Sequence, residues 1–321
     1  MDGFASSRLV FMGTPEFAVP SLKRLAKDHD VLAVYCQPPR RQGRGMKTRP
    51  SPVHQAADTL GIEVRCPLKF EDDEIAYLSG LNPDFLVVVA YGMILPQAVL
   101  DIPSKASING HASILPRWRG AAPIHRAIEH GDAETGATAM VMQAGLDTGP
   151  MLTIEKTTIT KTDTTGRLHD RLADITANVL AETLSSFDQL NPIPQEEDQV
   201  TWAEKITSQE AEMDFNQTYE VIDRRVRAFS PHPGAWVSLG GGDSALRLKI
   251  REIAPAPSNG TPGHVMGKGE NGGPVVACKD GGVELVRVQP AGKPVMAGRD
   301  FLNGYATPNK IKRVSDETIE E

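Results

Sequence analysis

The sequence has few cysteines, few aromatic residues and no long apolar run. Only 3 of the 321 residues are cysteine, and 5% are aromatic. Cys36, Cys66 and Cys278 are too far apart in the chain for a zinc motif, and so sparse a count is typical of a reducing compartment. No stretch approaches the roughly 18 consecutive apolar residues of a membrane-spanning helix. The opening MDGFASSRL also lacks the basic-then-apolar order of a secretion signal, so we expect a cytoplasmic protein without a membrane segment.

Several common catalytic signatures are also absent. The segment GTPEFAVPSL, which follows the first apolar run, has a single glycine and therefore lacks the G-x-G-x-x-G loop that binds pyrophosphate in dinucleotide enzymes. The sequence contains no Walker loop, no G-x-S-x-G elbow and no pair of histidines at zinc spacing. These absences argue against a nicotinamide dehydrogenase, an ATPase and a serine hydrolase, and we expect no bound metal.

Charge is distributed unevenly along the chain. The net charge is −7, which by itself would argue against nucleic-acid binding. Residues 224–313, however, contain 14 Lys or Arg against 6 Asp or Glu, while the rest of the chain contains 20 against 35. A basic C-terminal portion attached to an acidic N-terminal portion indicates a polyanionic partner for the former.

A second basic run, PPRRQGRGMKTRPSP, covers residues 38–52 and has no acidic residue. Its cations are Arg40, Arg41, Arg44, Lys47 and Arg49. Such a run could simply be a solvated surface loop. Its glycines and prolines also indicate a loop with several cations at its tip, a form suited to gripping phosphates.

The pattern of apolar runs predicts two domains. The chain has 321 residues, and a single hydrophobic core rarely grows beyond about 250 to 300 residues. Short apolar runs alternate with amphipathic stretches up to residue 190, and the run FLVVVAYG is apolar enough to be covered on both faces. This alternation predicts an α/β fold with a doubly wound, mostly parallel, Rossmann-like sheet.

The C-terminal portion has a different pattern. Five short runs separated by Gly- and Pro-rich turns predict a small β-barrel like an OB-fold, an architecture that often binds nucleic acid: AWVSL, ALRLKIREI, GHVMG, PVVAC and GVELVRVQ. The Pro- and acid-rich stretch NPIPQEEDQ is typical of a linker. We therefore predict a catalytic domain over 1–190, a linker over 191–205, a C-terminal domain over 206–315 and an acidic tail over 316–321.

Polar residues follow two of the predicted strands. Asn109 and His111 are two residues apart, so they project to the same side of a strand that ends there. Asp147 follows the next predicted strand, ATAMVMQA, and its carboxylate could reach the same crevice. Each residue alone could be a turn or surface residue. Together, an amide donor, an imidazole and a carboxylate suit an addition at a carbonyl carbon.

Several segments resemble those of methionyl-tRNA formyltransferases and occur in the same order, from about residue 8 to 305. They are VFMGTPEFAVPSL, QPPRRQGRGMKTRPSPV, VVVAYGMILP, NGHASILPRWRGAAPIHRAI, GDAETGAT, GLDTGPML, RAFSPHPGAW and VQPAGKPVMAGRDFLNG. The wider formyltransferase group shares mainly the Asn-x-His, Ser-x-x-Pro and Asp-Thr-Gly pattern. The PRWRGAAPI run, the basic loop and the C-terminal domain point to the tRNA family.

The resemblance implies transfer of a formyl group from 10-formyltetrahydrofolate to the methionine of initiator tRNA, with Asn109, His111 and Asp147 as the catalytic residues. It implies folate contacts from two segments: Tyr91, Gly92, Ile94 and Leu95, and Ser113, Ile114, Leu115 and Pro116. Arg44 takes the position of an arginine that the family inserts towards the tRNA acceptor end. The resemblance implies no metal and no membrane partner, and nothing in the sequence requires more than a monomer.

Two alternatives remain open from the sequence. A formyltransferase that acts on a small amine, such as a sugar nucleotide, would keep the chemistry but leave the basic segments unexplained. A folate- or RNA-binding protein without catalysis would leave the Asn109, His111 and Asp147 set unexplained. One departure from the family is Gly110, where a β-branched residue is usual; a glycine there is expected to loosen the strand by about 0.5 to 1 kcal/mol.

Overall fold

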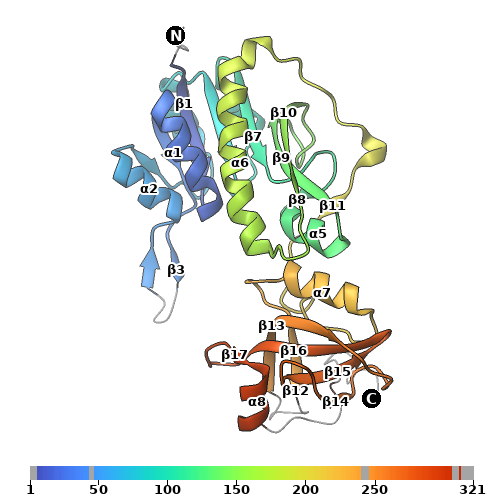
Figure 1. The fold of residues 1–321 in the computed structure, drawn as a ribbon. Helices are drawn as coiled ribbons and strands as arrows, with labels where there is room; N and C mark the ends of the chain where they lie inside the picture. Colours follow the sequence, from blue (N-terminus) through green and yellow to red (C-terminus); the bar gives the residue numbers. More distant parts are fainter. Residues whose placement is uncertain (1–5, 43–46, 240–245, 306–310, 312–321) are drawn as a thin grey trace, which may run out of the picture. The chain divides into compact units, whose positions relative to one another are not determined.

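The computed structural model describes residues 6–42, 47–239, 246–305 and 311. The chain divides into two compact units, which Figure 1 colours by sequence. Unit 1 comprises Met1–Pro123, Glu134–Thr158 and His169–Ala203, and unit 2 comprises Ile124–Ala133, Ile159–Leu168 and Glu204–Glu321. Unit 1 therefore includes most of the segment predicted as a linker.

Unit 1 is built on a seven-stranded sheet in the order β10-β9-β7-β6-β1-β2-β5. Its strands are β1 (Arg8–Gly13), β2 (Asp30–Tyr35), β5 (Val64–Arg65), β6 (Phe85–Val89), β7 (Ala106–His111), β9 (Glu134–Val141) and β10 (Met151–Thr158). The five strands from β5 to β7 in this order are parallel, and β9 and β10 are antiparallel to their neighbours. The predicted doubly wound, mostly parallel sheet is confirmed.

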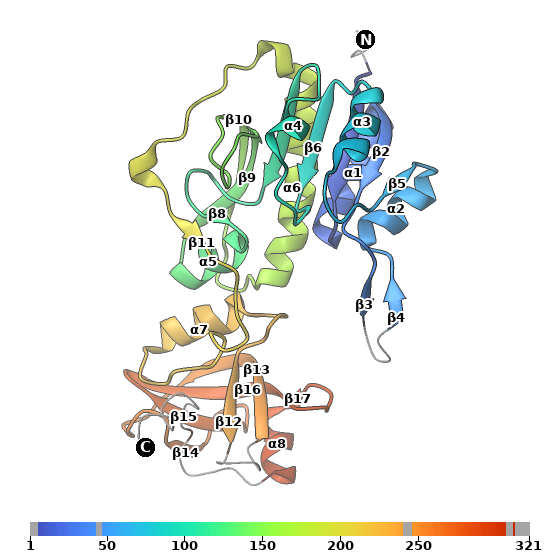
Figure 2. The same ribbon diagram turned by 180° about the vertical axis from the view of Figure 1, so that it is seen from behind.

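Helices cover both faces of this sheet. They are α1 (Val19–Asp28), α2 (Pro52–Leu60), α3 (Asp72–Gly80), α4 (Gln97–Leu100) and α6 (Thr165–Ser186), with 3-10 turns at Glu16–Ala18, Phe187–Gln189 and Glu197–Gln199. Helices α1 and α6 lie in front of the sheet in Figure 1, and α3 and α4 lie on the opposite face, in front in Figure 2. The start of α2 follows from the sequence, since Pro52 opens the helix and Ser51 Oγ accepts a hydrogen bond from His54 N at 3.2 Å.

The strand order reverses at β1, which pairs with β2 on one side and with β6 on the other. In open α/β sheets, ligands bind outside the carboxyl ends of the strands at such a switch point. The next strand along, β7, ends at His111 beside the end of β6, with Asn109 in register with Val88. The sheet therefore presents the end of β7 next to the expected crevice.

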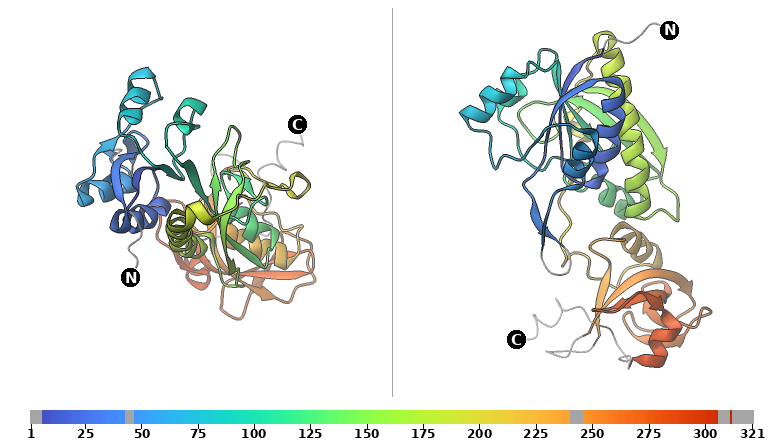
Figure 3. Two further views of the ribbon diagram at one scale, coloured as in Figure 1. Left: turned by 90° about the horizontal axis from the view of Figure 1, so that it is seen from above. Right: turned by 90° about the vertical axis from the view of Figure 1, so that its left-hand side faces the viewer.

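Two short strand pairs complete unit 1. The basic run forms a hairpin of β3 (Arg40–Gln42) and β4 (Lys47–Arg49), which extends away from α1 and α2 in Figure 2 and in the right-hand view of Figure 3. The second pair joins β8 (Arg119–Gly120) to β11 (Trp202–Ala203) in parallel, although about eighty residues separate them in the chain. The sequence did not predict β8 or β11.

Unit 2 contains an antiparallel sheet in the order β12-β13-β16-β15-β14, with β17 paired to β16. Its strands are β12 (Trp236–Leu239), β13 (Leu246–Ala256), β14 (Val265–Lys268), β15 (Pro274–Cys278), β16 (Gly281–Pro290) and β17 (Met296–Ala297). Its helices are α5 (Pro123–His130), α7 (Tyr219–Ala228) and α8 (Gly298–Gly304). The five predicted strands are all present, and the sheet is consistent with the predicted small barrel.

Within the described ranges, none of the helices combines the length and the apolar composition that crossing a lipid bilayer demands. The predicted acidic tail, 316–321, lies outside the described residues.

Candidate active site

Asn109 and His111 project from the last residues of β7 towards the same face of the sheet. Their side chains are buried, with 9% and 7% of their surface exposed. Gly110, between them, faces the other way, because a Cβ built on it would lie 2.7 Å from Thr176 Cγ2 on α6. The amide and the imidazole therefore share one face of the sheet, as their spacing predicts, and the structure shows that it is the face opposite α6.

The carboxylate of Asp147 meets both side chains. Its Oδ1 accepts a hydrogen bond from Asn109 Nδ2 at 3.3 Å, and its Oδ2 lies 3.6 Å from His111 Nδ1. Gly120 N donates to the same Oδ2 at 2.9 Å. The structure thus brings together the three residues that the sequence proposed, and adds a backbone donor from β8.

The route by which Asp147 reaches this place differs from the one we inferred. Strand β9 is antiparallel to β7, so its carboxyl end at Val141 lies beside Ile108 rather than beside His111. The loop after β9 returns the carboxylate, and Asp147 adopts a left-handed φ of +55° to do so. Residues other than glycine rarely adopt this backbone conformation unless neighbouring contacts hold it.

The ring of His111 faces an acceptor with each nitrogen. Its Nε2 lies 2.9 Å from the carbonyl oxygen of Trp118, which can only accept, so Nε2 carries a proton. Its Nδ1 faces the Asp147 carboxylate, so a proton on Nδ1 as well gives an attractive contact with that oxygen. The ring is therefore oriented with Nε2 towards the carbonyl oxygen of Trp118 and Nδ1 towards the Asp147 carboxylate.

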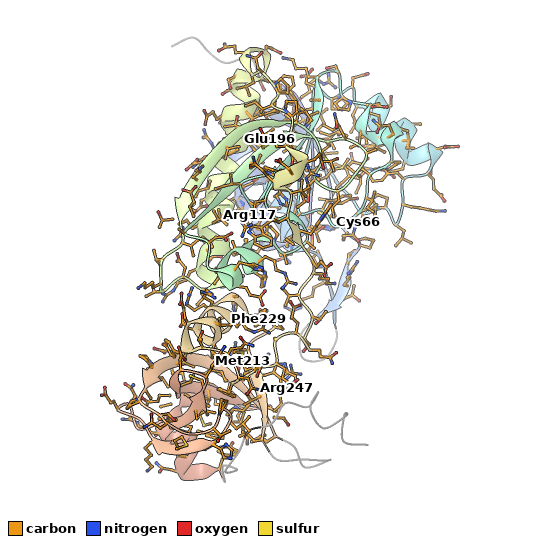
Figure 4. The ribbon with its side chains drawn as sticks, turned by 90° about the vertical axis from the view of Figure 1, so that its right-hand side faces the viewer. Cys66, Arg117, Glu196, Met213, Phe229 and Arg247 are labelled. Atoms are coloured by element: carbon orange, nitrogen blue, oxygen red, sulfur yellow. The ribbon has the colours of Figure 1, made fainter. Side chains whose placement is uncertain are left out.

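A buried amide supports the loop that bears Asp147. Gln195 Nε2 donates to the carbonyl oxygens of Asp147 at 2.8 Å and of Gly149 at 2.7 Å. Gln195 Oε1 accepts from Arg119 Nε at 2.9 Å, and the Arg119 guanidinium also pairs with Glu197 at 3.1 Å. Figure 4 labels Arg117 and Glu196, which mark the segments that bear Arg119 and Gln195; both segments belong to unit 1. Gln195 is not among the predicted site residues, because it lies in the stretch whose composition predicts a linker.

The predicted folate residues after β6 divide into buried and exposed groups. Tyr91 is 2% exposed and packs in the core cluster with Val88 and Leu95, and its hydroxyl has no hydrogen-bond partner among the described residues. Burial raises the pKa of that hydroxyl. Ile94 is 92% exposed and Gly92 is exposed with a left-handed φ of +80°. Of this segment, Gly92 and Ile94 are therefore the residues available to a ligand.

The second predicted folate segment is a tight turn after β7. Ser113 is fully buried, and its hydroxyl donates to the carbonyl oxygen of Arg117 at 2.6 Å. Leu115 is 2% exposed, and its backbone N–H donates to Thr138 Oγ1 at 3.2 Å. Ile114 and Pro116 are partly exposed. Ser113 and Leu115 thus fix the turn, and the other two residues are its accessible members.

Four of the five predicted tRNA-binding cations belong to the hairpin of β3 and β4. Arg40 and Arg49 pair across the two strands and are exposed, and Arg40 Nη2 donates to Gln37 Oε1 at 3.1 Å. Arg41 belongs to β3 and Lys47 to β4. Arg44 lies outside the described residues.

Two other kinds of chemistry find no support in the part of the chain that the structure describes. The described residues contain no cluster of three or more His, Cys, Asp or Glu that could hold a metal ion. Burial raises the pKa of the Cys36 thiol to about 11 and also raises the pKa of Cys66 and Cys278. A thiol with a raised pKa is a poor nucleophile at neutral pH.

Comparison with known proteins agrees with the geometry. The model of the formyl transferase family matches residues 7–184, and the model of the formyl transferase C-terminal domain matches residues 205–306. Methionyl-tRNA formyltransferase of Roseobacter denitrificans is 52% identical over 301 residues, which are 93% of this chain and 96% of the relative. The chain belongs to the methionyl-tRNA formyltransferase family. As a member, it is a formyl-transferring enzyme.

Solved structures share the fold of this family member at low sequence identity. HypX from Aquifex aeolicus in complex with tetrahydrofolic acid has a TM-score of 0.61 at 17% identity, over 96% of this chain and 51% of that one. The N-formyltransferase from Helicobacter canadensis, in complex with folinic acid and dTDP-3-aminofucose, has a TM-score of 0.61 at 19% identity, over 86% of this chain and 97% of that one. These likenesses concern the fold alone.

Proposed function

We propose that this enzyme transfers the formyl group of 10-formyltetrahydrofolate to the α-amino group of methionine on initiator methionyl-tRNA and releases tetrahydrofolate. The observation that carries the proposal is the meeting of Asn109, His111 and Asp147 at the end of β7. The exposed Gly92 and Ile94 and the partly exposed Ile114 and Pro116 are the residues we assign to folate contact.

The reaction needs stabilisation of a negative oxygen. The amine attacks the formyl carbon, the carbonyl oxygen becomes an oxyanion, and the bond from that carbon to N10 of the folate then breaks. Asn109 Nδ2 has a second N–H besides the one that it gives to Asp147. His111 Nδ1 lies 3.6 Å from Asp147 Oδ2, too far for an ordinary hydrogen bond, so an N–H there can donate to a substrate oxygen. We assign the oxyanion to these two donors. A charged donor strengthens such a hydrogen bond, which is the reason for a protonated His111.

The reaction also needs a proton to move. The attacking amine loses one proton, and N10 gains one when it leaves, so no net proton is consumed. The Asp147 carboxylate faces His111 Nδ1 at 3.6 Å, which is longer than an ordinary hydrogen bond. Catalytic hydrogen bonds often tighten only when substrate binds. We assign to Asp147 the tasks of keeping His111 charged and of relaying the proton towards N10.

Charge supports tRNA as the carrier of the amine. The β3 and β4 hairpin and residues 224–313 are the two basic parts of an otherwise acidic chain. Cations that meet phosphates supply most of the affinity of proteins for nucleic acids. We further propose that the enzyme works as a cytoplasmic monomer.

One assay tests the function against its alternatives. Purified enzyme is incubated with 10-formyltetrahydrofolate and either methionyl initiator tRNA or a dTDP-linked amino sugar, and the release of tetrahydrofolate is followed. We expect turnover with the tRNA only. Turnover with the sugar nucleotide alone would show that the formyl acceptor is a small amine and not tRNA. The absence of turnover with either substrate would indicate a binding protein without catalytic activity.

Arg44→Ala is expected to raise the KM for methionyl-tRNA about tenfold or more, because the loss of one phosphate contact weakens tRNA binding. Raising the salt concentration should raise this KM further. Affinity for 10-formyltetrahydrofolate, measured by fluorescence titration, should not change. Lys156→Ala is a matched control, since this exposed cation on β10 is already paired with Glu134 at 2.7 Å. Equal losses of tRNA and folate affinity in Arg44→Ala would contradict the assignment.

A further inference from the structure

The loop that bears Asp147 is held from a part of the chain remote in sequence. We infer that Gln195 is a positioning residue for catalysis, which fixes the backbone of Asp147 so that its carboxylate faces Asn109 and His111. This inference rests on the proposed function and extends it to a segment that composition alone marks as a linker.

The hydrogen bonds of Gln195 fix the orientation of its amide. Its two N–H groups meet two carbonyl oxygens, those of Asp147 and Gly149. Its oxygen meets the Arg119 guanidinium, which can only donate. Rotating the amide by half a turn would place its oxygen against two carbonyls and its nitrogen against a cation. The side chain is 8% exposed, so water cannot easily replace these contacts.

Gln195 binds the backbone of Asp147, the residue of the loop whose conformation most needs to be held by neighbouring contacts. Asp147 holds a left-handed φ of +55°, a backbone conformation that residues other than glycine adopt rarely. Gln195 binds the carbonyl oxygen of this same residue, while Gly120 N and Asn109 Nδ2 bind its carboxylate. Asp147 is thus held at its backbone and at its side chain, by different segments.

The backbone of the loop is closely packed at Gly149, which restricts the conformations that the loop can adopt. A Cβ on Gly149 would lie 1.7 Å from the carbonyl oxygen of Val141, so the loop backbone is pressed against the end of β9. Arg119, which holds the oxygen of Gln195, is 2% exposed and belongs to β8 beside Gly120. The same short strand therefore contacts Asp147 directly through Gly120 and indirectly through Arg119 and Gln195.

Two variants distinguish the hydrogen bonds of Gln195 from the space that its side chain fills. Gln195→Glu keeps the length of the side chain and the acceptor for Arg119, but it places a carboxylate oxygen against the two loop carbonyls. Gln195→Met keeps the length and burial without any donor. We expect kcat for methionyl-tRNA to fall about 10- to 100-fold in both, since small misplacements of catalytic groups have effects of this size. The KM values should change less than threefold. Asp198→Asn is the control, because Asp198 lies in the same segment and its side chain is exposed.

The decisive measurement is a double-mutant cycle with Asp147→Asn. If Gln195 acts through the carboxylate of Asp147, adding Gln195→Glu to Asp147→Asn should lower kcat less than threefold further. A residue that only supports the fold would lower kcat by the same factor in both backgrounds, and that result would overturn the inference. Melting temperatures of all variants show which of them are folded.

Two further outcomes separate this inference from the proposed function. A strongly impaired Asp147→Asn enzyme together with folded Gln195→Glu and Gln195→Met enzymes of normal kcat would overturn the role of Gln195 alone. A normal Asp147→Asn enzyme would overturn both the catalytic role of Asp147 and the inference.

Discussion

His111→Ala is expected to lower kcat for formylation of methionyl-tRNA about 100- to 1000-fold, the usual effect of removing one oxyanion donor. The substitution removes the ring whose Nδ1 faces the Asp147 carboxylate and whose Nε2 binds the carbonyl oxygen of Trp118. The KM for either substrate should change much less, because the lost contact is made mainly in the transition state. Initial rates measured with purified enzyme, with both substrates varied, provide the check.

Controls distinguish chemistry from folding in this variant. His111 is 7% exposed, so alanine leaves a cavity and could destabilise unit 1. His111→Gln fills most of that space and can still donate to Trp118 O, but it cannot become a cation; we expect it to fold normally and remain impaired. His130→Ala, at an exposed histidine of α5, should keep normal kinetics. Near-normal formylation by folded His111→Ala would remove His111 from the mechanism.

Gly110→Val is expected to destabilise unit 1 by about 1 to 3 kcal/mol, the usual cost of overpacking a core. The added Cβ would lie 2.7 Å from Thr176 Cγ2 and 3.0 Å from Leu180 Cδ1, so β7 or α6 must move. Asn109 and His111 flank this position, and kcat should therefore also fall, by about 10- to 100-fold. Thermal melting and initial rates measure the two effects, with about 2 to 4 °C of Tm per kcal/mol.

A second substitution tests the stated contact. Thr176→Ser removes the Cγ2 methyl group but keeps the hydroxyl that donates to Leu172 O at 2.7 Å. In a Gly110→Ala background it should restore part of the lost Tm and kcat, whereas Gly110→Ala alone should lower both. Gly80→Ala is the control, because a Cβ there meets no atom within 4 Å. Unchanged stability in Gly110→Val would mean that β7 is not confined by α6.

Gly110 illustrates how local patterns mislead. From the sequence, a glycine between two strand residues predicts a looser strand. In the structure it allows β7 to approach α6 so closely that a side chain would not fit. The identity of the residue is visible in the sequence, but the contact depends on a helix that begins more than fifty residues later. A β-branched residue at this place would therefore require a smaller side chain at position 176 or 180.

The parts that could be predicted are those with local signals. Apolar runs at regular spacing gave the parallel sheet, and the spacing of two gave Asn109 and His111 a common face. The direction of β9 and the pairing of β8 with β11 could not be predicted, because strand direction and pairing depend on segments far apart in the chain. Gln195 lay beyond prediction for the same reason: its environment is made by β8 and by the loop after β9, whereas its own neighbours in sequence are prolines and acids.

Left-handed backbone conformations gather around the catalytic residues. The described residues include four such residues other than glycine, and three of them are of this kind. Ala90 follows β6, Trp118 supplies the carbonyl oxygen that binds His111, and Asp147 supplies the carboxylate, while the fourth, Asn82, follows α3. Each conformation opposes the local preference of its residue and persists because neighbouring segments impose it. These loops should therefore relax before the sheet does when the fold is weakened, by heat or by a distant mutation. We expect the temperature range over which the enzyme works to be set by these loops rather than by the stability of its core.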